Sequence, residues 1–188
     1  MHKSLSEMTL DELWQLFPIV LAEHDPRWAD WYQAEETRIR SFVQTDAVRF
    51  SHIGSTAVSG IWAKPIVDIL LEVPKDASME SLKTVLECNG YTCMSETENR
   101  KSFNRGYTAE GFAQQVFHLH LRYFGDHDEL YFRDYLNDNP GIAKTYETLK
   151  RSLWKKYEHD RNAYTDAKTD FIKTHTALAK EAYPNRYE

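Results

Sequence analysis

The stretch from His52 to Val73, HIGSTAVSGIWAKPIVDILLEV, decides how this chain folds. An apolar run that ends at Ile53 is followed at once by a Gly54-Ser55 turn, and a second apolar run carries a single acid, Asp68. Glycine at a strand exit lets a ligand approach the backbone closely. A carboxylate inside a buried strand needs a metal, a cation or hydrogen-bond donors. The stretch therefore predicts two neighbouring strands with a polar site at their ends.

Helix and strand signals alternate as far as Tyr123, and only helical signals follow it. Strands are expected at residues 19–22, 48–53, 66–73, 91–94, 101–107 and 115–123, with 106–111 connecting the last two. Helices are expected at residues 9–17, 26–42, 79–88, 129–136, 142–157 and 161–183. We therefore expect a single α+β domain over residues 1–188, a mixed sheet flanked by helices. Its core covers about residues 24–125, and its helical C-terminal third covers about 127–183.

The composition narrows the class of protein. The 188 residues are 41% hydrophobic and 13% aromatic, which is enough for a sizeable core. The formal net charge of -6 argues against a broad nucleic-acid surface, although a local basic pocket for a small anion remains compatible with it. No apolar run approaches the roughly 20 residues that span a membrane, and the N-terminus lacks a signal-peptide core. We expect a cytoplasmic protein with Cys88 and Cys93 as free thiols.

The Gly-Ser turn and the acid are the first candidate site residues. Gly54, Ser55 and Thr56 suit phosphate binding at a helix start, although the same residues also form ordinary turns and caps. Asp68 suits a metal, with a salt bridge to Lys64 or Arg122 as the structural alternative. Strand alternation puts residues 68, 70 and 72 on one face. Residue 70 is leucine, and Glu72, roughly 13 Å from Asp68, is expected to be an exposed strand-end acid.

Two histidines are the second candidate. His118 and His120, in FHLHL, project from the same face of one strand, roughly 7 Å apart. Two imidazoles at this spacing can hold one metal ion, with Asp68 as a third ligand, and this set suits zinc, manganese or iron. The alternative is that both rings form hydrogen bonds inside a polar cleft or contact a ligand phosphate.

Basic residues are the third candidate. Lys64 follows the Gly-Ser turn, Arg105 and Arg122 fall on strands expected to be adjacent, and arginine suits bidentate binding of phosphate. Lys168 lies four residues after Tyr164 in the helical tail, so both share a helix face that can reach back over the sheet. Together these residues predict an anion pocket, although each alone also suits a solvated surface charge.

Four motifs in order resemble the GrpB family: HIGSTAVSGIWAKPIVDILLEV, FHLHL, FRDYLNDNP and HDRNAYTDAKTDFI. The resemblance runs from about His24 to Ala179, and the family is also found fused behind dephospho-CoA kinase. It implies a nucleotidyltransferase fold, in which a Gly-Ser turn is followed by paired acids that bind Mg²⁺ with a third acid. Gly54, Ser55 and Asp68 match the turn and the first acid. Leu70 occupies the second acid position, and the later strand offers His118 and His120 instead.

Three functions follow from these residues. The first is a metal-dependent nucleotidyl or phosphoryl transferase with an incomplete acid set, in which Ser55 and Lys64 contact the phosphates and Asp68 binds Mg²⁺, Mn²⁺ or Zn²⁺. The second is a non-catalytic protein that binds a nucleotide, a CoA-like molecule or another anionic metabolite. The third is a single-metal hydrolase built on Asp68, His118 and His120.

Overall fold

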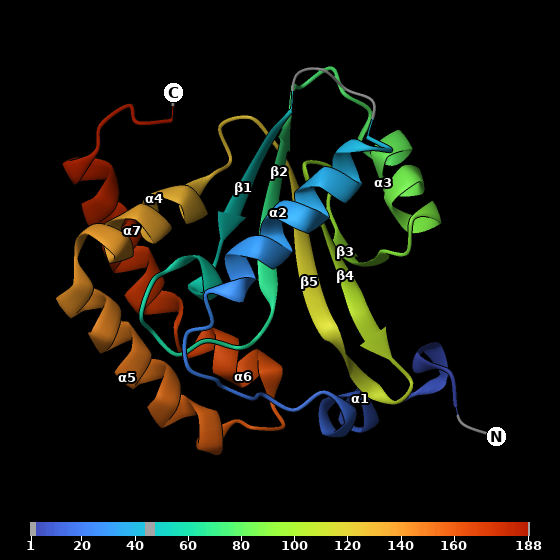
Figure 1. Ribbon diagram of the computed structural model, residues 1–188, viewed down its shortest axis with the longest axis horizontal. Helices are drawn as coiled ribbons and strands as arrows, with labels where there is room; N and C mark the ends of the chain where they lie inside the picture. Colours follow the sequence, from blue (N-terminus) through green and yellow to red (C-terminus); the bar gives the residue numbers. More distant parts are fainter. Residues whose placement is uncertain (1–2, 44–47, 188) are drawn as a thin grey trace.

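A five-stranded mixed sheet forms the centre of the molecule. The computed structural model describes residues 3–43 and 48–187. The strands are β1 (Arg49–Ile53), β2 (Val67–Val73), β3 (Thr92–Glu96), β4 (Arg100–Thr108) and β5 (Gly111–Tyr123), in the order β1-β2-β5-β4-β3 (Figure 1). β2 and β5 are parallel, and every other neighbouring pair is antiparallel. The parallel pair brings Asp68 and His118 side by side.

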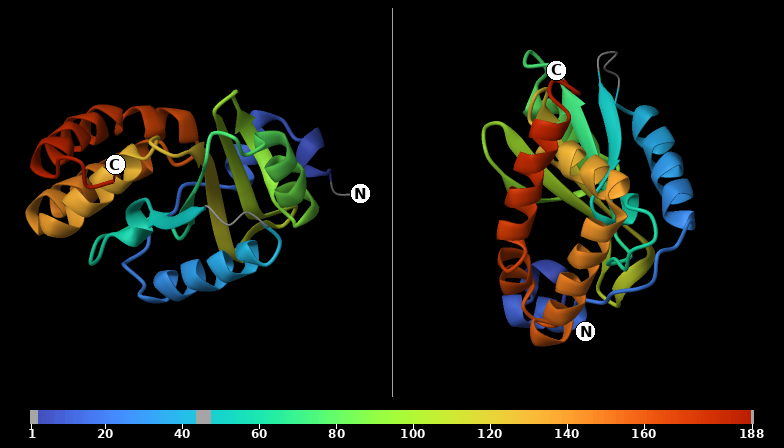
Figure 2. Two further views of the ribbon diagram at one scale, coloured as in Figure 1. Left: turned by 90° about the horizontal axis from the view of Figure 1, so that it is seen from above. Right: turned by 90° about the vertical axis from the view of Figure 1, so that its left-hand side faces the viewer.

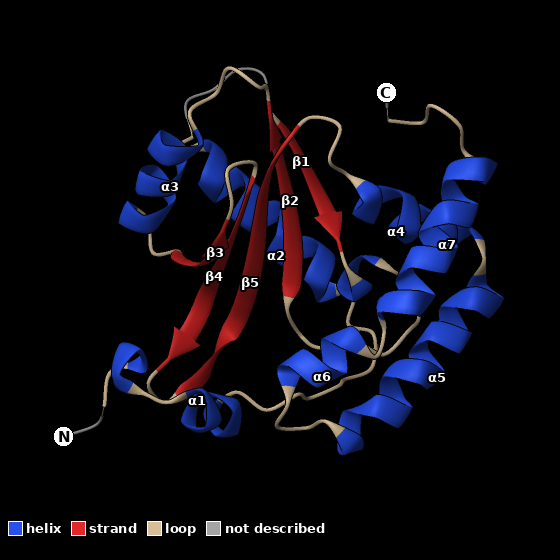
Figure 3. Cartoon of the chain, turned by 180° about the vertical axis from the view of Figure 1, so that it is seen from behind, coloured by secondary structure: helices blue, strands red, loops and turns tan. Residues whose placement is uncertain are grey.

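Helices lie on two sides of this sheet. The α-helices are α1 (Leu10–Leu16), α2 (Arg27–Arg40), α3 (Met79–Cys88), α4 (Asp128–Asp138), α5 (Pro140–Lys156), α6 (Arg161–Asp166) and α7 (Thr169–Ala182). Short 3-10 turns are formed by η1 (Leu5–Glu7) and η2 (Ser55–Ala57). α2 crosses one face of the sheet, with α3 next to it, whereas α4 to α7 gather beside β1 (Figures 1 and 2). Figure 3 shows these four helices from behind, on the same side as the C-terminal end of β1 and the N-terminal end of β2.

The main core lies between the sheet and helices α2 and α3. Ile69 and Leu71 of β2 point toward Trp28 and Ile39 of α2, and all four side chains are buried. β2 carries apolar residues on both faces because the C-terminal helices cover its other face, where Leu70 packs against Leu130 of α4. The predicted mixed sheet flanked by helices is confirmed.

The structure corrects three predicted boundaries. Residues 161–183 form two helices, α6 and α7, that are separated at Ala167 and Lys168. The connection predicted at 106–111 is a tight turn between longer strands, and Gly106 lies inside β4 at a bulge. A Cβ atom there would lie 2.4 Å from the Gln115 carbonyl oxygen, so only glycine fits. The predicted strand 19–22 is reduced to a single bridge between Ala22 and Ala63.

Two further observations bear on the class of protein. None of the helices within residues 3–43 and 48–187 is long and apolar enough to cross a membrane. Cys88 and Cys93 carry free thiols.

Candidate functional site

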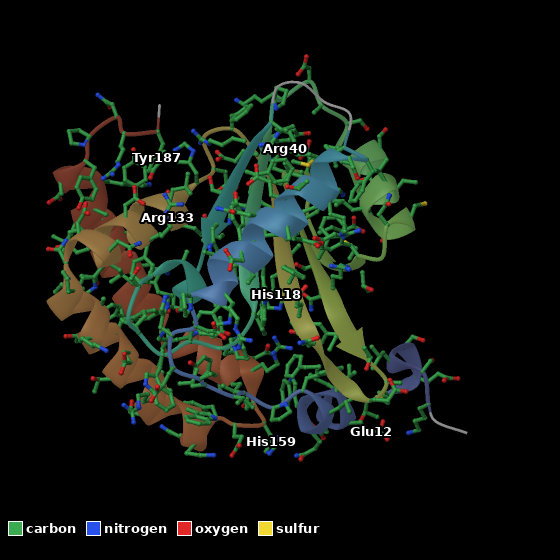
Figure 4. The ribbon with its side chains drawn as sticks, in the orientation of Figure 1. Glu12, Arg40, His118, Arg133, His159 and Tyr187 are labelled. Atoms are coloured by element: carbon green, nitrogen blue, oxygen red, sulfur yellow. The ribbon has the colours of Figure 1, made fainter. Side chains whose placement is uncertain are left out.

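A cavity of about 650 Å³ lies between the sheet and the C-terminal helices. The β1–η2 turn and the parallel strands β2 and β5 form one wall, and α4 to α7 form the other. Eight of the site residues named from the sequence line this cavity: Gly54, Ser55, Thr56, Lys64, Asp68, His118, His120 and Lys168. Figure 4 shows His118 near the middle of the molecule, on β5. The turn, the acid, both histidines and two of the predicted basic residues thus share one cavity.

Gly54 lies directly against Asp68. Asp68 pairs with Ile53 across the antiparallel strands, so the turn that follows Ile53 passes over the carboxylate. A Cβ atom on Gly54 would lie 2.3 Å from Asp68 Oδ2, and the Gly54 φ of 72° also favours glycine. The glycine predicted for close backbone approach is therefore needed to admit the acid itself.

Asp68 accepts hydrogen bonds from both histidines. Its Oδ1 lies 3.2 Å from His118 Nδ1 and 3.4 Å from His120 Nε2, and its side chain is 25% exposed, toward the cavity. Burial alone would raise the pKa of Asp68, but the hydrogen bonds from His118 and His120 outweigh it and hold this pKa below its ordinary value. Asp68 is therefore an ionised carboxylate throughout the physiological pH range.

A chain of hydrogen bonds fixes the tautomer of His118. The ionised Asp68 can only accept, so His118 Nδ1 donates to it and His118 Nε2 accepts from the Tyr107 hydroxyl at 2.9 Å. The Tyr107 oxygen accepts in turn from the Arg161 guanidinium of α6, also at 2.9 Å. Burial lowers the pKa of His118 and the Asp68 carboxylate opposes this effect, with a lowered pKa as the result. The ring is thus held neutral and oriented by α6.

The predicted metal set does not fit these side chains as they stand. Both nitrogens of His118 are already engaged, since Nδ1 donates its proton to Asp68 and the Nε2 lone pair accepts from Tyr107, so neither nitrogen is free for a metal. Among the residues that the structure describes, no group of three histidine, cysteine, aspartate or glutamate side chains is arranged to hold a metal ion. The hydrogen-bonded polar cleft, the alternative interpretation of FHLHL, matches the observed contacts.

Three lysines from separate elements line the cavity next to Asp68. Lys64 precedes β2, Lys150 lies on α5, and Lys168 lies at the break between α6 and α7. We call these three residues the lysine cluster. Lys150 and Lys168 are only 2% and 9% exposed. Lys150 donates to the Trp62 carbonyl oxygen, and among the described residues no carboxylate lies within ion-pairing distance of any of the three.

Burial and nearby cations lower the pKa of each residue in the lysine cluster. Burial is the main cause in all three, and it lowers the pKa of Lys150 and of Lys168 to about 7 and that of Lys64 to about 8. The neighbouring cations add to the effect, and Asp68 opposes it for Lys64 and Lys168. Three ammonium groups that line one cavity, none of them in an ion pair with a carboxylate among the described residues, are suited to binding an anion.

Two tyrosines complete this end of the cavity. The Tyr164 hydroxyl is buried and has no hydrogen-bond partner within residues 3–43 and 48–187, while the ammonium groups of Lys168 and Lys64 lie 4.2 and 5.8 Å from the centre of its ring. Burial raises the pKa of Tyr146 above its usual range, and the Ser55 hydroxyl acts in the opposite sense. Ser55 and Tyr164 thus add hydroxyl groups beside the lysine cluster.

Two of the residues predicted to bind the ligand use their polar groups elsewhere. The Thr56 hydroxyl donates to the Ile66 carbonyl oxygen and contacts His52 Nε2 at 2.9 Å, so it links the turn to the segment before β2. η2 is a single 3-10 turn rather than a helix start. Arg122 is buried, its guanidinium donates to the Lys101 and Leu121 carbonyl oxygens, and it does not line the cavity.

Arg105 lies on the opposite face of the sheet from the cavity. It is paired in register with Phe117, a residue of the main core, and its guanidinium forms an ion pair with the buried Glu35 of α2 at 2.8 Å. Arg105 was predicted to lie beside Arg122 because their strands were expected to be adjacent, and β4 and β5 are indeed adjacent. Strand alternation, however, turns positions 105 and 122 to different faces.

No second acid lies beside Asp68 on β2. Leu70 is fully buried between Ile53 and Leu130. Glu72 was expected to be exposed, and this is wrong, since its side chain is 0% exposed. Arg49 binds it with two hydrogen bonds of 2.6 and 2.7 Å, and His127 contacts it at 3.0 Å. Leu70 and Glu72 thus stabilise the fold and do not line the cavity.

Sequence reasoning missed Lys150 and assigned no role to Tyr164. The signal for Lys150 was present, because Ala143, Tyr146 and Lys150 follow helical spacing on the buried side of α5. A lysine in such a stripe points into the protein, unlike its neighbours on the same helix. Helical spacing placed Tyr164 on the same face as Lys168, but a buried tyrosine ordinarily only packs, so no ligand role was assigned to it.

Comparison with known proteins identifies the family. Residues 18–178 match the family described as GrpB protein. The chain belongs to the GrpB family. The Glutamate-rich protein GrpB of Alkalihalophilus pseudofirmus is 32% identical over 166 residues, which cover 82% of this chain and 91% of that protein. The UPF0157 protein YqkA of Bacillus subtilis is 31% identical over 160 residues, which cover 84% of this chain and 46% of that protein.

Solved structures agree with this assignment. The crystal structure of conserved protein GrpB from Enterococcus faecalis matches with a TM-score of 0.76 and 29% identity, over 87% of this chain and 99% of that chain. The predicted GrpB fold is thus confirmed. The Cid1 poly(U) polymerase matches at 9% identity with a TM-score of 0.47, over 75% of this chain and 43% of that chain. At that distance the likeness supports no inference about activity.

Some relatives are much longer than this chain. A dephospho-CoA kinase of Mycobacterium leprae is 26% identical over 183 residues, and the chain spans 45% of its length, as it spans 46% of YqkA. The similarity to dephospho-CoA kinases that the family resemblance implied is confirmed, over part of those proteins.

Proposed function

We propose that the protein binds a phosphorylated small molecule, a nucleotide or a CoA-like metabolite, in the cavity beside Asp68. The observation that carries this proposal is the lysine cluster, in which Lys150 and Lys168 are buried and no carboxylate forms an ion pair with any of the three among the described residues. A buried ammonium without a counter-ion is costly, and a phosphate supplies both the opposite charge and the acceptors. The Tyr164 hydroxyl, which has no hydrogen-bond partner in the described part of the chain, offers one further donor.

The rest of the cavity is suited to the remainder of such a ligand. Phe132, Leu136 and Ile172 contribute apolar surface from α4 and α7. A nucleoside or a pantetheine-like chain combines an apolar part with a few polar groups, as ligand cavities usually require.

Binding is tested by calorimetry and thermal shift with adenine and uracil nucleotides, coenzyme A and dephospho-coenzyme A. Lys150→Met and Lys168→Met each remove a charge-assisted hydrogen bond worth about 1.5–3 kcal/mol, so we expect affinity to fall by about tenfold or more. Lys155→Met is the matched control, because Lys155 lies on the same helix with a 69% exposed side chain. Equal affinity of wild type and both cluster variants, or no binding of any compound, would contradict the proposal.

Nucleotidyl or phosphoryl transfer is the second candidate, and the placement of Asp68 favours it. The ionised carboxylate lies against the Gly54 turn and faces the cavity. Leu70 and Glu72 do not supply the second acid, so Asp68 would be the only acid of β2 in the cavity. The test is nucleotide turnover with and without Mg²⁺ or Mn²⁺ in wild type and Asp68→Asn. Turnover lost in Asp68→Asn with binding retained supports transfer, and binding without turnover in wild type refutes it.

A further inference from the structure

The positive charge of the lysine cluster exceeds the negative charge of the carboxylate that faces it. Lys64, Lys150 and Lys168 come from three different elements and line one cavity. Asp68 is the carboxylate that faces Lys64 and Lys168, and its Oδ1 already accepts from His118 and His120. A single shared carboxylate cannot neutralise three ammonium groups.

The other charged groups that face the cluster do not correct this imbalance. The Arg161 guanidinium of α6 faces Lys64 and adds a positive charge. Glu147 of α5 faces Lys150 but is paired with Lys144 at 2.9 Å and accepts from the Trp62 backbone. His118 faces Lys64, and burial lowers its pKa and so favours the neutral ring. Asp128 and Glu129 of α4 also line the cavity, but among the described residues neither forms an ion pair with the cluster, and Asp128 is paired with Lys180 at 2.6 Å. Tyr146 and Tyr164 are uncharged because burial raises the pKa of each.

Such a cluster responds to an anion by changing its own protonation. Three amines in a desolvated space repel one another, so in the free protein the cluster gives up protons near neutral pH. The lowered pKa values of Lys150 and Lys168 express this tendency. An anion placed among the amines favours their charged forms and draws the protons back.

We infer that the cavity takes up a ligand of at least two negative charges together with protons, so that its occupancy is coupled to the charge of the lysine cluster. The inference rests on the proposed function and specifies the ligand class, because a phosphate ester or a diphosphate meets the charge requirement and a single carboxylate does not. Occupancy then decreases as the pH rises from about 7 to about 9, by up to about tenfold in affinity per pH unit for each proton taken up.

The test follows the amines of the free protein and of the protein with a simple dianion. Lysine labelled with ¹³C and ¹⁵N reports the titration of each amine by NMR, with the cluster resonances assigned from Lys150→Met and Lys168→Met. If either variant fails to fold, Lys150→Arg or Lys168→Arg gives the same assignment. The probe is sulfate, which stays a dianion throughout the titration, with chloride at matched ionic strength as the reference. Lys155 is the internal control because it is exposed on α5.

Three results are distinguishable. Amines of the cluster that titrate near pH 7 in chloride and at least about one unit higher in sulfate, with the Lys155 signal the same in both salts, support the inference. Amines that titrate near 10 in chloride overturn it, even if nucleotides bind. Amines that titrate near 7 in both salts also overturn it, because the cluster then does not respond to a multivalent anion. The ligand screen with Lys150→Met and Lys168→Met decides the proposed function separately.

Discussion

At the residue scale, the lack of a side chain at Gly54 leaves the space that the Asp68 carboxylate occupies. Gly54→Ala places a Cβ 2.3 Å from Asp68 Oδ2 at a φ of 72°, so the turn must move or strain. We expect a loss of about 3 kcal/mol in unfolding free energy, measured by urea denaturation. Gly60→Ala is the matched control, because Gly60 has the same φ and nothing within 4 Å of its Cβ position, so about 1 kcal/mol is expected. Equal losses would show that the contact with Asp68 is unimportant.

The buried ion pair of Glu72 is a second test at single residues. Arg49→Leu leaves the fully buried Glu72 carboxylate with His127 as its remaining partner. Breaking a buried pair by removing one partner costs about 3–5 kcal/mol, so we expect a loss near about 3 kcal/mol in urea denaturation. Arg100→Leu breaks the exposed pair with Asp126 and should cost at most about 1 kcal/mol. A small loss in Arg49→Leu would show that the ion pair between Arg49 and Glu72 contributes little to folding.

At the residue scale, strand alternation predicted the facing of side chains wherever it was applied consistently. It placed His118 and His120 on one face, and both contact Asp68. Arg105 was grouped with Arg122 by proximity, without regard to the face on which each lies, and the structure separates them. The burial of Glu72 could not be predicted, because it depends on Arg49, which is distant in sequence and adjacent only in the sheet.

At the element scale, the buried Lys150 of α5 makes the unfolding free energy of the protein depend on pH. Burial lowers the folded pKa of Lys150 to about 7, whereas an unfolded lysine has a pKa near 10.4, so the unfolded chain binds more protons between these values. The unfolding free energy therefore rises with pH, by about 1 kcal/mol per unit for this group between about pH 7.5 and 10. Lys150→Met removes this contribution, so its stability relative to wild type should decrease as the pH rises.

Chemical denaturation at pH 7, 8 and 9 checks this prediction. The difference between variant and wild type is the relevant quantity, since other groups titrate in both proteins. Lys155→Met should show a constant difference, because that side chain is 69% exposed on the same helix. A constant difference for Lys150→Met would indicate a fully charged Lys150.

The elements themselves were predicted well where a terminal signal exists. Thr9 and Glu12 form the capping box of α1, Ser78 caps α3, and Pro140 starts α5. No proline or glycine marks the break at Ala167 and Lys168, and both residues keep helical backbone angles. The break could not be read from local sequence, whereas the four-residue spacing of Tyr164 and Lys168 did predict that the two side chains lie together.

At the scale of the whole molecule, the site exists only where two parts of the chain meet. Residues before 125 supply the turn, Asp68 and the histidines, and the C-terminal helices supply Lys150, Lys168 and Tyr164. The sequence predicted both parts and their order. Their docking depends on contacts such as Leu70 with Leu130 and Val58 with Leu136, which pair residues about 60 to 80 positions apart. Periodicity within one segment carries no information about such pairs.

These contacts predict that the two parts fold as one unit. The C-terminal helices bury Ile53 and Leu70 on the sheet, and α5 is tied to the N-terminal segment by the Trp154 indole, which donates to the Ile19 carbonyl oxygen at 2.5 Å. We expect one cooperative unfolding transition for the full chain, with near-UV and far-UV circular dichroism coincident in urea. A fragment of residues 1–126 should lack a cooperative transition, because it exposes the apolar face that α4 covers. Two separate transitions, or a fragment that unfolds cooperatively, would show instead that the sheet folds alone and that the C-terminal helices close the cavity as a separate step.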